Sequence, residues 1–112
     1  MSVTAKTLFE ALQAQDAETA QYTTPLGTRT IIDKLTGTNT TAAVATLTVK
    51  LVASGGAAGA ANTIVSAKTL QPGESYTFPE VVGHVLNPGD FISTLAGTAA
   101  AVTIRASGRE VS

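Results

Sequence analysis

The stretch from Val44 to Val52, VATLTVKLV, restricts the possible folds of this chain more than any other feature. Apolar and polar side chains alternate along it, with Ala45, Leu47, Val49 and Leu51 on one side and Thr46, Thr48 and Lys50 on the other. A period of two is typical of a β-strand that has one face buried and one face in water. Because the apolar face leaves water only when a second sheet or a helix covers it, the chain must build a layered structure around this strand.

The composition restricts the size of the fold and the partners it can bind. With 112 residues, the chain can form one domain and bury roughly two thirds of its unfolded surface. Charged residues make up 13% of the sequence and the net charge is -1, so no electrostatic attraction to nucleic acid or to an anionic membrane is expected. A sparsely charged surface rich in threonine suits contact with another protein instead.

Several kinds of site and signal are missing from the sequence. The chain has no cysteine, which excludes disulfides, thiolate metal sites and thiol nucleophiles. The N-terminal residues MSVTAKTLFEAL lack a basic region followed by an apolar run, and no segment approaches the length of about 18 apolar residues that spans a bilayer. We therefore expect a protein made in the cytoplasm, without a signal peptide or a membrane contact.

Residues 4–14 fit two structures. A helix would place Leu8, Ala11 and Leu12 on one face, whereas a strand would align Leu8 and Leu12 with Glu10 and Ala14. We favour the strand, because every later segment has β character. Residues 1–18 are interpreted as an N-terminal segment, either an arm or a first strand, ahead of a β-sandwich domain over residues 19–112.

The remaining strands are separated by turn residues. They are predicted at 19–24, 29–39, 44–52, 62–70, 76–78 with 81–86 after the interruption at Pro79, 91–96 and 101–111. Turns are expected at Pro25 to Gly27, Gln71 to Glu74 and Asn87 to Asp90, from their Pro and Gly. The total of roughly seven or eight short antiparallel strands, spaced by about 8 to 12 residues, predicts a single-domain all-β protein, a β-sandwich or jelly roll.

Two details of strand pairing can be predicted. Within strand 29–39, Ile31 and Leu35 share a face with Asp33, and a β-bulge near Asp33 would reconcile this pattern with a half-buried strand. The polar segment Thr38 to Ala43 leads directly into VATLTVKLV, so the two strands are expected to form a hairpin.

No group of residues has the pattern of a catalytic or metal site. His84 is the only histidine, it is expected in the strand 81–86, and Glu80 alone would be a poor partner for a metal. We assign His84 a surface or structural role. A triad is excluded because this histidine would be the only base and no Gly-x-Ser-x-Gly elbow is present. The sequence predicts a protein that is not an enzyme and uses no cofactor.

Other candidates are equally weak. The loop SGGAAGAAN, residues 54–62, lacks the Gly-Lys-Ser/Thr of a Walker loop, and it is interpreted as a flexible exposed loop that could contact a protein. Asn39-Thr40-Thr41 matches the glycosylation sequon by chance, since no secretion signal is visible. Arg105 and Arg109 are interpreted as surface or interface charges, because no aromatic stacking platform accompanies them.

The chain as a whole resembles small all-β proteins encoded among the virion structural genes of tailed bacteriophages. The segments that carry the resemblance are Tyr22 to Pro25 (YTTP) with Gly27 to Arg29 (GTR), Thr38 to Thr41 (TNTT), Val52 to Gly56 (VASGG), Leu70 to Tyr76 (LQPGESY), Leu86 to Phe91 (LNPGDF) and Ala101 to Val111 (AVTIRASGREV). Together they cover roughly residues 20 to 112 and leave the first 15 outside.

The resemblance implies a capsid decoration or cement protein, which binds the capsid exterior and bridges neighbouring subunits of the major capsid protein. Such a protein is a virion component made in the cytoplasm of the bacterial host, and a dimer or trimer would match the symmetry of a shell. The residues expected to make contacts are those assigned no role in the core: Leu8, Phe9, Leu12, Ser54, Gly55, Gly56 and Asn62.

Two other functions remain open. A tail, neck or fibre-associated module would use the same fold in few copies per particle. A carbohydrate-binding or receptor-binding β-sandwich would need exposed aromatic platforms, and the chain has only two Tyr and three Phe residues for both a core and a site.

Overall fold

The structure, a computed structural model, describes residues 1–112 and consists of nine β-strands and one short 3-10 helix. The elements are β1 (Val3–Gln13), β2 (Thr19–Thr23), β3 (Arg29–Asn39), β4 (Ala45–Val52), η1 (Ala60–Asn62), β5 (Thr63–Leu70), β6 (Ser75–Thr77), β7 (Val85–Leu86), β8 (Phe91–Ala96) and β9 (Val102–Val111). No helix in it has the length and apolar character that a membrane crossing requires.

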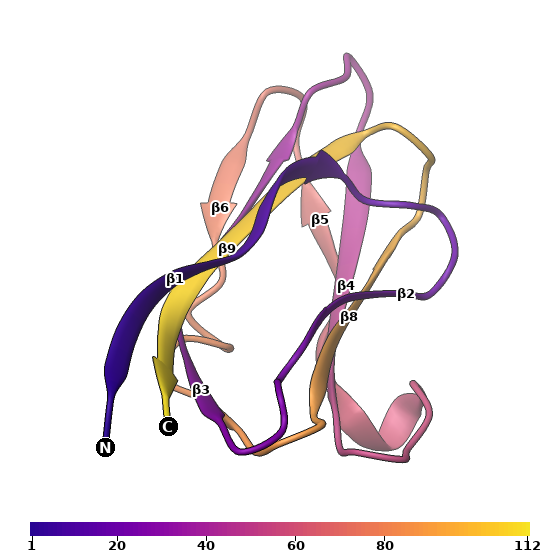
Figure 1. Cartoon of the computed structure of the whole chain (residues 1–112). Coiled ribbons are helices and arrows are strands. Elements are labelled where there is room, and N and C mark those ends of the chain that lie inside the picture. Colours follow the sequence, from indigo (N-terminus) through magenta and orange to yellow (C-terminus); the bar gives the residue numbers. More distant parts are fainter.

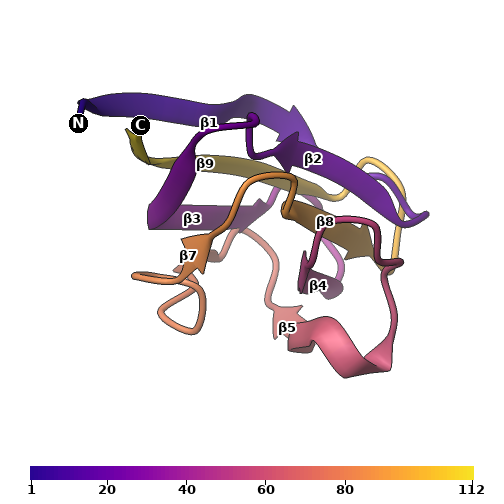
Figure 2. The ribbon, with the colours of Figure 1, turned by 60° about the horizontal axis from the view of Figure 1, so that its bottom comes forward.

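The strands form two antiparallel sheets that face each other. Sheet A has the order β1-β9-β3, and both β6 and β7 pair with the far side of β3. Sheet B has the order β2-β8-β4-β5. Figures 1 and 2 show that β1 and β9 run alongside each other at one edge of the molecule, with the two chain ends adjacent. The predicted all-β sandwich is confirmed, although it contains nine strands instead of seven or eight.

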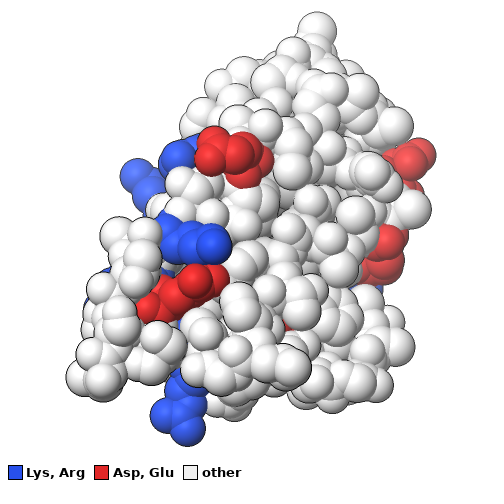
Figure 3. Space-filling model, viewed as in Figure 1, with Lys and Arg blue, Asp and Glu red and all other residues white.

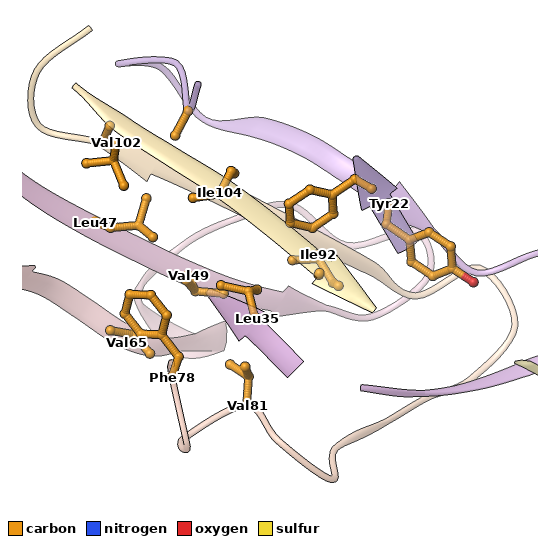
Figure 4. Packing of buried hydrophobic residues seen from close by; sticks show 14 of the residues in the cluster. Tyr22, Leu35, Leu47, Val49, Val65, Phe78, Val81, Ile92, Val102 and Ile104 are labelled. Carbon is orange, nitrogen blue, oxygen red and sulfur yellow. The ribbon is translucent and has the colours of Figure 1, made fainter. Parts of the chain in front are cut away.

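The core lies between the two sheets and follows the predicted alternation of β4. Ala45, Leu47 and Val49 are buried and the intervening Thr46, Thr48 and Lys50 are half-buried. At the end of the strand Val52 is buried and Leu51 is only partly covered. Ala45, Leu47 and Val49 belong to a cluster of 20 buried side chains, and Leu51 packs against it. Phe78, Ile92 and Ile104 of this cluster are fully enclosed (Figure 4).

The expected bulge near Asp33 is confirmed. Ile32 pairs with Gly108 and Lys34 pairs with Ser107, so Asp33 is the extra residue on β3. A Cβ at position 108 would lie 2.2 Å from the carbonyl oxygen of Ile31, which explains why glycine occupies the strand opposite the bulge.

The expected hairpin between β3 and β4 is wrong, because the two strands belong to different sheets. The buried side chain of Asn39 directs the chain across the sandwich. Its amide donates to the carbonyl oxygens of Ala43 at 2.7 Å and Leu70 at 3.0 Å, while its Oδ1 accepts from the Thr41 N–H at 2.9 Å. These bonds satisfy the backbone of a tight crossover that a hairpin would have satisfied by strand pairing.

One further strand prediction needs correction, and one correctly predicted strand contains an irregularity. Residues 79–83 form turns, with Gly83 at φ +85, so only Val85–Leu86 of the expected strand 81–86 pairs with β3, and His84 lies in an exposed turn. In β5, Ala67 adopts φ +45 and interrupts the alternation, so Val65 and Leu70 are buried while Ala67 and Thr69 are exposed. The bulge at Ala67 is held by a hydrogen bond of 2.9 Å from its N–H to Thr48 Oγ1.

The two Pro-Gly turns form as predicted, and each of them contains one further hydrogen bond of the same kind. Gly73 and Gly89 have φ values of +75 and +85, which the third position of such a turn requires. The acidic residue that ends each turn accepts a hydrogen bond from the backbone N–H of the residue that begins it, Glu74 from Gln71 at 2.7 Å and Asp90 from Asn87 at 2.9 Å. Glu74 and Asp90 are therefore turn-forming residues that lie in separate turns.

Candidate interaction surfaces

The contact residues predicted in the N-terminal segment are largely part of the core. Leu8 and Phe9 are each only 7% exposed and belong to the buried cluster, and the half-buried Leu12 packs against it. The expectation that these side chains serve no role in the core is wrong, because β1 is the edge strand of sheet A and pairs with β9 along its length. Bulges after Thr7 and Phe9 turn Leu8, Phe9 and Leu12 toward the interior.

The loop over residues 54–62 lies at one end of the sandwich, next to the turn at Asn87 to Asp90. Ser54, Gly55 and Gly56 are exposed and Asn62 is half-buried. Asp90 Oδ1 accepts a hydrogen bond of 3.0 Å from the Ser54 N–H, which ties the loop to that turn. Asn62 donates to the carbonyl oxygen of Ala57 at 2.9 Å and accepts from the Gly59 N–H at 3.0 Å. The loop is therefore exposed as predicted, and Asn62 is used in holding its shape.

Basic residues gather on sheet A. Five of the seven Lys and Arg residues lie in its three long strands: Lys6, Arg29, Lys34, Arg105 and Arg109. Most of the basic side chains visible in Figure 3 are on the side of the molecule formed by β1 and β9. The strands of sheet B contain only Lys50 and Lys68. The basic residues are therefore concentrated on sheet A, whose long strands also contain the acidic residues Glu10, Asp33 and Glu110.

Three basic side chains form the centre of this surface, which we call the basic face: Lys34, Arg105 and Arg109. Arg109 is bound to Asp33, with Nε and Nη2 within 3.2 Å of the carboxylate oxygens, and this pairing raises the pKa of Arg109. Lys34 and Arg105 have no carboxylate partner, and they border an open hollow of about 280 Å³ together with Thr36 and Ser107. This arrangement can bind carboxylates.

The outer face of sheet B carries one internal ion pair. Lys50 Nζ contacts the Glu18 carboxylate, which also accepts a hydrogen bond of 2.7 Å from Ser93 Oγ. Burial opposes the charge of Glu18, but the hydrogen bonds from Lys50 and Ser93 outweigh this effect and lower its pKa. With Lys50 neutralised in this way, the face presents mainly Thr, Ser, Ala and partly covered Phe91 and Leu95.

A polar group inside the sandwich joins the two sheets near the chain ends. Tyr22 on β2 lies 2.7 Å from the Thr30 hydroxyl of β3 and donates a hydrogen bond of 2.6 Å to Glu110 of β9. Burial and the adjacent Glu110 carboxylate raise the pKa of Tyr22 to about 12. Lys6 Nζ is 3.8 Å from the same carboxylate. Each of these side chains has a polar partner, and their hydrogen bonds link sheet A to sheet B.

The structure contains no cluster of three or more His, Cys, Asp and Glu residues that could hold a metal. The largest surface hollow, of about 670 Å³, lies between the chain ends, residues 27–29 and the Asn87-Pro88 turn, and Arg29 is its only charged side chain. The Asp33 carboxylate binds Arg109, and the Glu80 carboxylate lies 3.5 Å from the Tyr76 hydroxyl.

The basic face could not be recognised from sequence reasoning. The sequence predicts surface or interface charges at Arg105 and Arg109, but Lys34 lies 71 positions before Arg105 and joins them only through the pairing of β3 with β9. The sequence contains one signal for this surface: Arg105 and Arg109 are an even number of positions apart, so both lie on the polar side of the last strand.

Comparison with known proteins identifies related folds and no related sequence. No protein-family model and no curated protein matches the chain. The fold is similar to chains in structures of infectious bursal disease virus, with a TM-score of 0.54 at 10% identity for the Gt strain and 0.51 at 13% identity for the Gx strain. The crystal structure of the VP2 subviral particle of that virus matches with a TM-score of 0.48 at 14% identity.

The similarity extends over nearly all of this chain but only part of the viral chains. It covers 97% of this chain in each case, and 32% of the Gt-strain chain and 31% of the other two. The two-sheet fold of this protein thus occurs as about one third of a larger viral chain.

Proposed function

We propose that this chain is a non-enzymatic structural protein of a virion, and specifically a decoration or cement protein that binds the outside of a capsid. The observation that carries the proposal is the fold, since the sandwich matches chains in two structures of a virus particle over 97% of its length. A virion structural role is consistent with these neighbours. The assignment to tailed bacteriophages rests on the sequence resemblance.

A cement protein acts by adding contact area across the boundaries between capsid subunits. Each added interface stabilises the assembled shell relative to its separated subunits, and no chemical step is needed. Because the shell repeats the same site many times, a weak contact at one site is sufficient for tight retention when the protein bridges two subunits.

The basic face is the surface that we assign to the capsid contact. Lys34 and Arg105 are exposed, have no carboxylate partner and border an open hollow, so an acidic surface could approach them without displacing an existing ion pair. A guanidinium and an ammonium together favour carboxylates from Asp and Glu. The partner is therefore a capsid protein with an acidic outer surface at its subunit boundaries.

The first experiment measures the copy number of this protein in purified particles, by quantitative mass spectrometry against the major capsid protein. A number comparable with that of the capsid protein is expected. A few copies per particle would instead indicate a tail, neck or fibre-associated module, and complete absence from particles would overturn the virion assignment.

A second experiment tests the basic face with variants of equal charge change. Lys34→Gln combined with Arg105→Gln lowers the net charge by two and removes both free cations. Ala20→Glu combined with Thr23→Glu lowers it equally, but on exposed positions of β2 in sheet B. Particle occupancy is expected to fall about tenfold or more for the first pair only. Equal losses for both pairs would remove the basic face from the proposal.

A further inference from the structure

We propose that the exposed edge of β1, at Val3 to Thr7, pairs with the same segment of a second copy of this chain. The pairing is antiparallel around a two-fold axis at Ala5, so that the two A sheets become one continuous sheet. The first six residues are exposed and Thr7 is half-buried (Figure 2 shows this end of β1 extending beyond sheet B).

The backbone of this segment has unpaired hydrogen-bonding groups that face outward. Ser2 and Ser112 exchange both backbone hydrogen bonds, at 2.7 and 2.9 Å, and the pairing continues in register to Thr7 with Ser107. In an antiparallel ladder the residues that bond to one neighbour alternate with those that face the other side. The N–H and C=O groups of Val3, Ala5 and Thr7 therefore point away from β9, toward the open edge.

The other three edges of the sandwich are protected. The β5 edge is interrupted by the bulge at Ala67, and Lys68 lies across the side of the sandwich with its Nζ 4.6 Å from the centroid of the Tyr76 ring. The opposite edge of sheet A is divided into the short strands β6 and β7 with Pro79 between them. β2 has only five residues and a register shift after Ala20. Such features prevent edge pairing, and Val3 to Thr7 has neither a bulge nor a proline.

Two features determine which residues of the two copies face each other: the direction of the backbone hydrogen-bonding groups, and the charge of Lys6. The outward residues must face each other, which permits an axis at Thr4, Ala5 or Lys6. An axis at Lys6 would place two ammonium groups opposite each other. Within β1, an axis at Thr4 would pair only Val3 with Ala5, because Thr7 would face Met1, which lies outside the strand. An axis at Ala5 pairs Val3 with Thr7 and Ala5 with itself, for about six hydrogen bonds.

A second copy fits this edge better than an unrelated strand. When the two-fold axis lies at Ala5, Thr4 of one copy faces Lys6 of the other, so no like charges are opposed. The Lys6 ammonium lies 3.8 Å from the Glu110 carboxylate of its own chain. The small side chains of Val3, Ala5 and Thr7 leave the edge accessible. A contact of about five residues is smaller than a standard protein interface, so dissociation in the high micromolar to millimolar range is expected.

The test uses engineered cysteines, because the chain has none of its own. Ala5→Cys places two sulfurs at opposed positions, where the Cα atoms would be about 5.5 Å apart and a disulfide can form. The control is Thr77→Cys at the exposed edge position of β6. In a glutathione buffer, Ala5→Cys is expected to form a covalent dimer at least about tenfold faster than Thr77→Cys. Equal rates would overturn the proposal, and faster dimerisation of Thr4→Cys would overturn its register.

Sedimentation equilibrium provides a readout without cross-linking. The unmodified chain is expected to associate as its concentration approaches about 1 mM. Ala5→Lys, which sets two ammonium groups against each other at the axis, is expected to remain monomeric, whereas Thr77→Lys is expected to associate as the unmodified chain does. A monomer at every concentration would contradict the pairing. Neither experiment requires a virion, so failure of the proposed capsid role would leave both results interpretable.

Discussion

The Tyr22 hydroxyl on β2 of sheet B donates a hydrogen bond of 2.6 Å to the Glu110 carboxylate on β9 of sheet A. The two residues are 88 positions apart in the sequence, and they meet only because the sheets pack face to face. Thr30 of β3 completes the group from 2.7 Å. The end of the sandwich near the chain termini is therefore held by polar contacts, whereas its middle is apolar.

Tyr22→Phe is expected to lower the free energy of unfolding by about 1–2 kcal/mol at neutral pH, because the Thr30 and Glu110 oxygens lose a buried partner. Urea unfolding measures the difference. Tyr76→Phe, which removes a hydroxyl whose contact with Glu80 is 3.5 Å long and exposed, is the matched control and should cost less. Equal losses would show that the Tyr22 hydrogen bonds contribute nothing specific.

The Tyr22 pKa also predicts a pH dependence. The folded pKa is raised from 10.0 to about 12, so the folded state favours the protonated phenol. This contribution to stability is complete below pH 10 and is lost as the pH rises toward 12. In a Tyr76→Phe background, tyrosinate absorbance of the folded chain should follow the raised value. Titration near 10 in the folded chain would contradict the buried hydrogen bond.

Asn39→Ala is expected to destabilise the fold by about 2–4 kcal/mol, because the side chain is fully buried and three backbone groups, two in the crossover and one at the end of β5, lose its hydrogen bonds. Asn62→Ala removes a half-buried asparagine with two loop contacts and should cost about 1 kcal/mol or less. Thermal unfolding of both variants measures the two losses of stability. A similar loss in each would mean that the crossover does not depend on Asn39.

Gly108→Ala is expected to destabilise the fold by about 3 kcal/mol, since the added Cβ would meet the Ile31 carbonyl oxygen at the bulge. Ser107→Ala, at the adjacent half-buried position, should change stability little. Chemical denaturation of both variants tests the bulge, and a tolerated alanine at 108 would show that Asp33 is not the extra residue.

Phe9→Ala is expected to cost about 3–5 kcal/mol, because the ring belongs to the buried cluster. Leu12→Ala, at a half-buried position packed against the same cluster, should cost less. Removal of residues 1–18 is expected to unfold the chain, since β9 would lose one of its two partners in sheet A and the core would lose Leu8, Phe9 and Ala14. A folded truncated chain would favour the interpretation of this segment as an arm over that of a required first strand.

The sequence by itself determined the local structure. Alternation identified β4, Pro and Gly identified the turns at residues 71–74 and 87–90, and the polar Asp33 on the face of Ile31 and Leu35 identified a bulge. Each of these signals is local, because side-chain period and backbone φ act over a few residues. The absence of cysteine likewise excluded whole classes of site before any fold was known.

Only the tertiary structure decided which strands are neighbours. Asn39 and Leu70, or Lys34 and Arg105, are brought together by sheet order, and sheet order depends on long-range pairing that leaves no trace in a local pattern. For the same reason Leu8 and Phe9 could be taken for contact residues, since their burial depends on bulges against β9. The basic face and the open edge of β1 are consequences of that order, and both exist only in the assembled sandwich.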